Sequence, residues 1–244
     1  MHPSILNALN FQTPPKLVMF DLDGTLVDSA YDIAAAVDKV LVKNQHPAAG
    51  EQRIRQWVGN GAERLIRRAL VWLQCLESKK ELSGDIFEQA ADKLEENQVQ
   101  KYLQQFLLAY QAVPIAKTVL YPGVEECLQA LHKQKIKMAV ITNKPIDLTW
   151  PILKGLKIDH YFELVLGGDS LPEKKPNPMP LQHAMKKFLA RSCQCIMVGD
   201  SKADIFAAQA AKVKVVAVDY GYSNGTPVQT WQPNYVTSNL SLGK

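Results

Sequence analysis

Two carboxylates stand two positions apart at the point where an apolar segment ends near the amino terminus. The segment Val18–Phe20 is followed by Asp21, Asp23 and Gly24. A polar turn is the simplest interpretation, because Asp and Gly are favoured in turns. The chemical interpretation is a phosphate site in which both carboxylates work with a metal ion, with Gly24 bending the chain so that both acids face the site.

Polar residues also follow three later apolar segments, which favours the chemical interpretation. Asp204 follows Asp200 by four positions, so the two share one face of a helix that begins there. Because ligands of parallel sheets bind at the carboxyl ends of the strands, these residues are predicted to meet in one site. The residues at the three later ends are Thr142, Asn143, Lys174, Lys175, Asp200 and Asp204.

These residue types suit phosphoryl transfer. Mg²⁺ prefers oxygen ligands and keeps several waters, so two or three carboxylates are enough to hold it. A metal, a lysine and backbone N–H groups stabilise the charge of a phosphoryl group in transit. One carboxylate can attack phosphorus to form an aspartyl-phosphate, and a second can protonate the leaving alcohol and then deprotonate water.

The elements that must position these residues form an α/β pattern. Short, fully apolar strands alternate with amphipathic helices, which is typical of a parallel sheet buried on both faces. The sequence therefore predicts a Rossmann-like, doubly wound parallel sheet. The predicted strands are 16–20, 137–142, 162–167, 195–200 and 213–218, and the helices between the later ones include 123–134 and 180–190.

A long helical insert interrupts this pattern after the first strand. Residues 63–73 and 85–110 are amphipathic with a helical period, and no strand pattern lies between 31 and 118. A parallel connection needs only about a dozen residues, so the excess predicts an inserted all-helical domain. The predicted domains are a catalytic core of residues 1–30 and 119–244, with 1–15 as a loose lead, and a helical cap of residues 31–118, with 112–123 as the return linker.

The four polar motifs, in this order, resemble the haloacid dehalogenase superfamily of phosphatases. They read DLDGT from Asp21, TN from Thr142, KP from Lys175 and GDSKAD from Gly199. The insert resembles the helical cap of that superfamily. Two further stretches, WVGNGAERLIRRAL from Trp57 and YGY at 220–222, look like its phosphoglycolate phosphatase branch.

The resemblance implies roles for the acids. Asp21 corresponds to the nucleophile. Asp23 corresponds to the general acid and base, and its backbone carbonyl also binds Mg²⁺. Asp200 corresponds to the third metal ligand. Ala203 stands where the family often has Asn, which removes a side-chain hydrogen bond but none of the ligands.

The resemblance also implies how the phosphate is held. Thr142 and the backbone of Asn143 are expected to bind it, and Lys175 is expected to stabilise its charge and that of the nucleophile. Lys174 remains an alternative to Lys175. Asp204 is expected to steady either the metal or the lysine, with a surface acid as the plainer interpretation.

The implied function is Mg²⁺-dependent hydrolysis of 2-phosphoglycolate to glycolate and phosphate through an aspartyl-phosphate. Phosphoryl transfer like that of β-phosphoglucomutase is one alternative, and hydrolysis of another small phosphate ester or of pyrophosphate is a second. A receiver-like signalling module that takes phosphate on an aspartate is a third. That class uses a shorter domain without a large helical insert, which speaks against it.

The charge, the apolar runs and the cysteines indicate which partners the protein binds and where in the cell it is located. The net charge is +4, and the sequence contains no run of five or more basic residues, which argues against nucleic-acid binding. No apolar run approaches the ~20 residues of a membrane helix, and the amino terminus lacks a signal-peptide pattern. Four scattered cysteines predict free thiols rather than a zinc site. We therefore expect a cytoplasmic enzyme, a monomer or small homo-oligomer, acting on a small phosphorylated metabolite.

Two features of the helical insert can each be interpreted in two ways. Arg64, Arg67 and Arg68 either meet a substrate carboxylate or lie on a solvated helix face. Trp57 and the turn at 59–61 either close over the site or simply join two helices.

Overall fold

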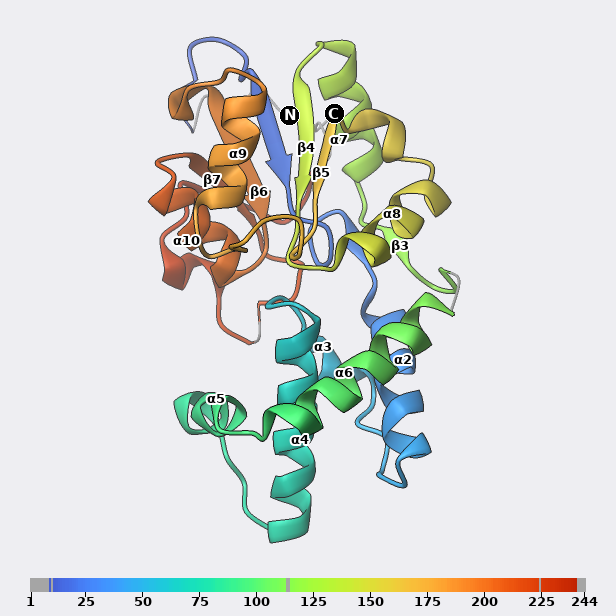
Figure 1. Cartoon of the computed structure of the whole chain (residues 1–244). Coiled ribbons are helices and arrows are strands. Elements are labelled where there is room, and N and C mark those ends of the chain that lie inside the picture. Colours follow the sequence, from blue (N-terminus) through green and yellow to red (C-terminus); the bar gives the residue numbers. More distant parts are fainter. Residues whose placement is uncertain (1–8, 10, 113–114, 224, 241–244) are drawn as a thin grey trace.

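A six-stranded sheet forms the centre of the computed structural model, which describes all residues except 1–8, 10, 113–114, 224 and 241–244. Every neighbouring pair in the sheet is parallel, in the order β5-β4-β1-β6-β7-β8 (Figure 1). The predicted doubly wound α/β core is therefore confirmed. The strands are β1 (Leu17–Phe20), β4 (Lys137–Ile141), β5 (Leu164–Leu166), β6 (Cys195–Gly199), β7 (Lys214–Val218) and β8 (Tyr235–Thr237).

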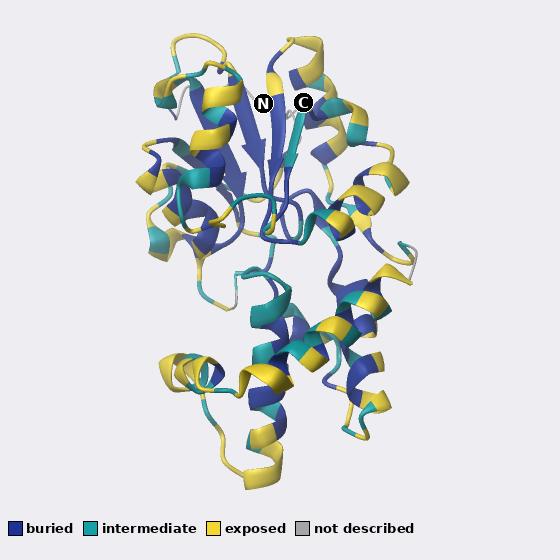
Figure 2. Ribbon diagram, in the orientation of Figure 1, coloured by how far each residue is buried: buried dark blue, intermediate teal, exposed yellow. Residues whose placement is uncertain are grey.

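Both faces of the sheet are buried, which explains why its strands read as continuous apolar runs. Val18 and Phe20 pack into one core cluster, whereas Leu17 and Met19 pack into another on the opposite face. The central strands β1, β4, β6 and β7 are accordingly mostly dark blue in Figure 2, whereas β5 at the edge is mostly teal. The helices are α7 (Val124–Lys133) and α8 (Ile146–Gly155) on the first face, and α9 (Met179–Lys187) and α10 (Lys202–Ala210) on the second.

The order of the strands reverses beside β1. The chain leaves β1, adds β4 and then β5 on one side, and returns to place β6 on the other side. In a sheet of this kind the crevice at the carboxyl ends of the strands, next to the reversal, is where ligands bind. The residues that follow β1, β4 and β6 therefore surround one position.

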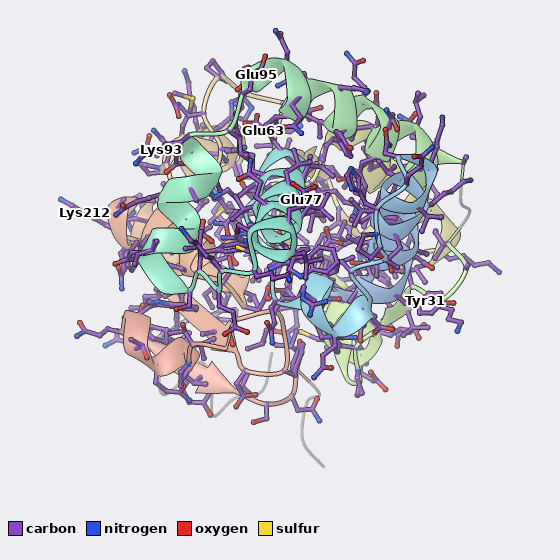
Figure 3. All side chains as sticks on the ribbon, turned by 90° about the horizontal axis from the view of Figure 1, so that it is seen from below. Tyr31, Glu63, Glu77, Lys93, Glu95 and Lys212 are labelled. Carbon is purple, nitrogen blue, oxygen red and sulfur yellow. The ribbon has the colours of Figure 1, made fainter. Side chains whose placement is uncertain are left out.

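Five helices lie beyond the carboxyl edge of the sheet (Figure 1). They pack around a core cluster that consists almost entirely of their own side chains, among them Ile54, Leu70 and Phe106. Seen from below, they lie in front of the sheet, with Glu63 and Glu77 near the centre (Figure 3). The helices are α2 (Ala30–Lys43), α3 (Glu51–Arg55), α4 (Ala62–Ser78), α5 (Gly84–Asp92) and α6 (Glu96–Gln111).

A short antiparallel pair joins the five helices to the sheet region. The strand β2 (Val27–Asp28) pairs with β3 (Val119–Leu120), so the outgoing and returning chain run side by side. The sequence did not predict this pair, because two residues are too few to form a periodic pattern. The part of the chain that the structure describes also contains three 3₁₀ turns, at Asp159–Tyr161, Ser192–Gln194 and Val228–Trp231.

The prediction of one continuous helical stretch over residues 85–110 is wrong, because the chain forms two helices there, α5 and α6. The chain leaves the helix between α5 and α6, where Glu95 has an extended backbone. The reason is tertiary: α5 packs on α4, whereas α6 packs across both α4 and α2. The segment 93–95 contains no Gly or Pro to mark the turn.

Smaller differences concern the ends of the chain and of the strands. The predicted strand 162–167 shrinks to β5, and β8 was not predicted at all. The predicted loose lead 1–15 lies mostly outside the described residues, although Leu9 is buried in the first core cluster. The four cysteines are all free thiols. Among the described residues, we find no helix with the length and apolar character needed to cross a membrane.

Candidate active site

The chain bends sharply after β1, as the sequence predicts. Asp21 is buried directly after the strand, and its N–H donates to the carbonyl of Val198 on β6. Gly24 has a φ of 86°, a left-handed conformation that side chains disfavour. A Cβ added to Gly24 would also lie 2.3 Å from Oδ2 of Asp200. The bend therefore requires glycine for conformation and for space.

Three buried carboxylates meet beside this bend. Asp21, Asp200 and Asp204 each offer an oxygen within 4.8 Å of the other two. Burial, and then the like charge of Asp204, raises the pKa of Asp21 to about 7, and the same two causes raise the pKa of Asp200 well above its usual range. The three buried carboxylates repel one another, and their oxygens are suitable ligands for a hard divalent cation such as Mg²⁺.

Two neutral donors hold the carboxylate of Asp200. The hydroxyl of Thr25 donates to Oδ1 at 2.8 Å, and the N–H of Tyr222 donates to Oδ2 at 2.7 Å. The Tyr222 hydroxyl in turn accepts from the N–H groups of Ser29 and Ala30 at the start of α2. The loop 220–222 therefore connects the acidic cluster to the joint between the sheet and the five helices.

Lys175, not Lys174, enters the cluster. Its ammonium lies 3.0 Å from Oδ1 of Asp21 and 2.5 Å from Oδ1 of Asp204, and its side chain is buried. The other oxygen of Asp204 accepts from the N–H and hydroxyl of Ser201. Both oxygens of Asp204 are thus engaged, so of the two predicted partners the structure places it on the lysine. Lys174 is exposed.

Thr142 and Asn143 follow β4 and are both buried beside the cluster. The Thr142 oxygen accepts from the N–H of Lys144 at 3.2 Å. The amide of Asn143 donates to the carbonyl of Lys175 at 2.9 Å, which ties the lysine loop to this strand end. The Asn143 Oδ1 atom is buried without a hydrogen-bond partner among the described residues.

The Asp23 side chain is not part of the group of three acids. Its Oδ1 accepts from the hydroxyl of Ser29 at 2.5 Å, and both oxygens lie within 3.2 Å of the Lys144 ammonium. Tyr110 of α6 accepts from the same ammonium at 3.0 Å. The Asp23 side chain lines the same cavity as Asp21, which is compatible with the predicted role as general acid and base, and leaves the predicted metal contact to its backbone carbonyl.

Sequence reasoning gave no role to Lys144, Tyr110 or Ser29. Lys144 stands in the same polar turn as Thr142 and Asn143, and its position after a strand end is a signal that marks it. Tyr110 lies in a helical pattern where an aromatic residue most often indicates packing. Its role depends on where the five helices sit.

A small cavity of about 40 Å³ lies between Asp21, the residues that follow β4, and the helices α2, α4 and α6. The loop 59–61 lies over it: a Cβ added to Gly61 would be 3.1 Å from the carbonyl of Asn143, and one added to Gly59 would be 3.8 Å from Cβ of Ser201. The loop both joins two helices and contacts the strand ends on either side of β1. The core residues that line the cavity are Asp21, Asp23, Thr142, Asn143, Lys144, Pro145 and Leu148.

The three arginines of α4 are occupied within the insert. Arg64 pairs with Glu88 and Asp92, and Arg67 pairs with Glu63 and Glu96. Arg68 is buried and donates to Glu88, to the carbonyl of Trp57 and to Oδ1 of Asn60. These residues therefore tie α4 to its neighbours and hold the loop over the cavity, and none of them lines it.

The sequence model of one protein family, the haloacid dehalogenase-like hydrolases, matches residues 18–218 of this chain. The chain belongs to this family. Among its relatives is the phosphoglycolate phosphatase of Pseudomonas fluorescens strain Pf-5, which is 45% identical over 226 residues, 93% of this chain and 77% of that one. The phosphoglycolate phosphatase of Nitrosococcus oceani is 40% identical over 226 residues, 93% of each chain.

A solved crystal structure has the same fold over nearly the whole chain. It is described as a predicted phosphoglycolate phosphatase from Haemophilus somnus 129PT, with a TM-score of 0.83 and 38% identity. The match covers 94% of this chain and 96% of that chain. The similarity therefore extends over the five helices as well as the sheet.

The raised pKa of Asp21 predicts how the stability of the protein changes with pH in a chelator. The folded state keeps a proton on Asp21 up to about pH 7, whereas an unperturbed Asp loses it near 3.8. Between these values the folded state binds more protons, so the free energy of unfolding falls as the pH rises. In thermal melts with chelator, we expect the melting temperature to fall from about pH 5 to about pH 7.5, and to fall less in Asp21→Asn. An equal fall in both proteins would contradict this origin.

Proposed function

We propose that this chain is a Mg²⁺-dependent phosphatase that hydrolyses 2-phosphoglycolate to glycolate and phosphate. The observation that carries the proposal is the 40–45% identity to phosphoglycolate phosphatases across 93% of the chain, including the helices that would meet the organic part of a substrate. The small cavity between these helices and the acids supports a small substrate.

We propose that Asp21 and Asp200, with the backbone carbonyl of Asp23, hold Mg²⁺. When bound, the ion neutralises charge on the phosphoryl oxygens. The raised pKa values of Asp21 and Asp200 support this assignment, because a nearby divalent cation would stabilise both as carboxylates. Asp204 keeps Lys175 in place and is not needed as a ligand.

In the first half of the reaction, a carboxylate oxygen of Asp21 attacks phosphorus. The bond between phosphorus and the leaving oxygen breaks, and Asp23 gives its proton to that oxygen. Lys175, the Thr142 hydroxyl and the N–H of Asn143 stabilise the phosphoryl oxygens. The product of this half is glycolate, with the phosphoryl group on Asp21.

In the second half, Asp23 takes a proton from a water that attacks the same phosphorus. The bond between phosphorus and the Asp21 oxygen breaks, so phosphate leaves and the carboxylate is restored. Burial of Asp21 beneath the 59–61 loop supports this scheme, since bulk water must stay away until glycolate departs.

We propose that residues 31–118 form the cap and that residues 1–30 and 119–244 form the catalytic core. Two observations support the division: the separate core cluster of the five helices and the β2–β3 pair at the joint. Such a cap would close over the substrate and open for product release. The cytoplasmic location and the monomeric or small homo-oligomeric state remain predictions from the sequence.

The experiment that tests the proposed function is a substrate panel assayed with Mg²⁺. It contains 2-phosphoglycolate, β-glucose 1-phosphate, pyrophosphate and p-nitrophenyl phosphate. We expect kcat/KM for 2-phosphoglycolate to exceed the others by about 100-fold, equivalent to about 2.7 kcal/mol of transition-state discrimination. Weak and even turnover of the panel would overturn the substrate, and conversion of β-glucose 1-phosphate to glucose 6-phosphate would favour a mutase.

A further inference from the structure

We propose that Lys144 is the residue that binds the carboxylate of the substrate and thereby selects 2-phosphoglycolate over uncharged phosphate esters. This inference rests on the proposed function and deepens it. It combines the place of Lys144 in the cavity, its contact with Asp23 and the charges of the surrounding residues.

Lys144 brings a buried ammonium to the side of the cavity where the leaving group must lie. The side chain is 5% exposed, and its ammonium lies 3.1 Å from Oδ2 of Asp23. The leaving oxygen has to come within hydrogen-bond reach of Asp23 to receive its proton. In 2-phosphoglycolate one methylene separates that oxygen from the carboxylate, so a group that binds the carboxylate must stand beside Asp23.

Among the described residues that line the cavity, Lys144 is the one with a cationic side chain. Lys175 lies between Asp21 and Asp204, on the phosphoryl side. Arg64 and Arg67 of the insert are each held in two ion pairs outside the cavity. The cavity thus contains one ammonium available to an organic anion.

The hydrogen-bonding capacity of the Lys144 ammonium leaves room for a substrate carboxylate. The ammonium has three N–H donors and contacts two residues, Asp23 and Tyr110, so one donor can turn to the substrate while the two Asp23 oxygens share another.

Tyr110 holds the ammonium in this position. Its hydroxyl accepts from Lys144 at 3.0 Å, and the ammonium lies 4.4 Å from the centre of the Tyr110 ring. Because Tyr110 belongs to α6, the carboxylate site is complete only when the insert lies on the sheet. Tyr110 is a positioning residue in this proposal.

The test compares 2-phosphoglycolate with its neutral amide, phosphoglycolamide, which has nearly the same shape. For each enzyme we take the ratio of kcat/KM for the acid to kcat/KM for the amide. In Lys144→Met this ratio is expected to fall at least about 30-fold. A loss of this size is in the range expected when a hydrogen bond to a charged group is removed. Any disturbance of Asp23 affects both substrates and cancels in the ratio.

Lys174→Met is the matched control, because Lys174 is an exposed lysine near the 59–61 loop. Its ratio is expected to equal that of the wild type. Tyr110→Phe is expected to lower the ratio by a smaller factor than Lys144→Met. If Lys144→Met does not fold, Lys144→Gln replaces it, since the amide retains a donor to Asp23 and Tyr110.

The two proposals fail in different ways. Failure of the wild type to hydrolyse 2-phosphoglycolate overturns the proposed function. If the wild type hydrolyses it but does not distinguish the amide, or if the Lys144 variants keep the wild-type ratio, the role of Lys144 is overturned and the proposed function stands.

Discussion

Replacing Asp21 by Asn is expected to lower turnover of 2-phosphoglycolate by at least about 10⁴-fold, as removal of a catalytic nucleophile does. The amide has the size of the carboxylate but cannot attack phosphorus. The fold is expected to remain intact, because burial disfavours the charged form of this group and raises its pKa to about 7. At about pH 8 the variant should therefore be at least as stable as the wild type in urea melts with chelator.

Asp219→Asn provides the matched control for this experiment. Asp219 also follows a strand of the sheet, β7, but it is exposed and accepts a hydrogen bond from Ser238. We expect its kcat/KM to stay close to that of the wild type. Near-normal turnover in Asp21→Asn would contradict the mechanism, and a large loss in Asp219→Asn would mean that the assay reports general damage at this edge of the sheet.

Replacing Lys175 by Met is expected to damage both activity and stability. The ammonium is buried between Asp21 and Asp204, and it is the cation that pairs with both. Its loss leaves clustered carboxylates without a counter-charge, which costs about 3–5 kcal/mol of unfolding free energy when a buried ion pair is broken. We expect kcat/KM to fall by about 10³-fold, within the range of losses seen when one stabilising group of an anionic transition state is removed.

A double variant separates these two effects. Adding Asp204→Asn to Lys175→Met removes a buried charge while keeping an oxygen that can accept from Ser201. We expect urea melts to recover most of the lost stability and kcat/KM to remain low. Unchanged stability of Lys175→Met in chelator, or recovery of activity in the double variant, would contradict the role of this lysine.

The sheet and the acids of the site were accessible from sequence because their signals are local. Val18–Phe20 is apolar on both faces, and Asp21 follows it directly, so burial and position can be read from one short stretch. The same holds for Thr142 after β4 and Asp200 after β6. A parallel sheet then brings these strand ends together regardless of the sequence distance between them.

The contact between Lys144 and Tyr110 was not accessible in this way. Lys144 meets Tyr110 across the boundary between sheet and insert, and that contact depends on how the five helices sit. The break between α5 and α6 has the same origin, since each helix packs against different neighbours. Periodicity indicates that a helix has an apolar face, but it does not say what that face meets.

The measurement that tests the central claim most directly is a rapid acid quench of the wild-type enzyme mixed with Mg²⁺ and ³²P-labelled 2-phosphoglycolate. Acid stops turnover while an aspartyl-phosphate survives long enough for proteolysis and mapping of the labelled peptide. We predict label on the peptide that contains Asp21, formed no more slowly than kcat, and none in Asp21→Asn. Steady release of phosphate without labelled protein, or label on a different residue, would contradict the account.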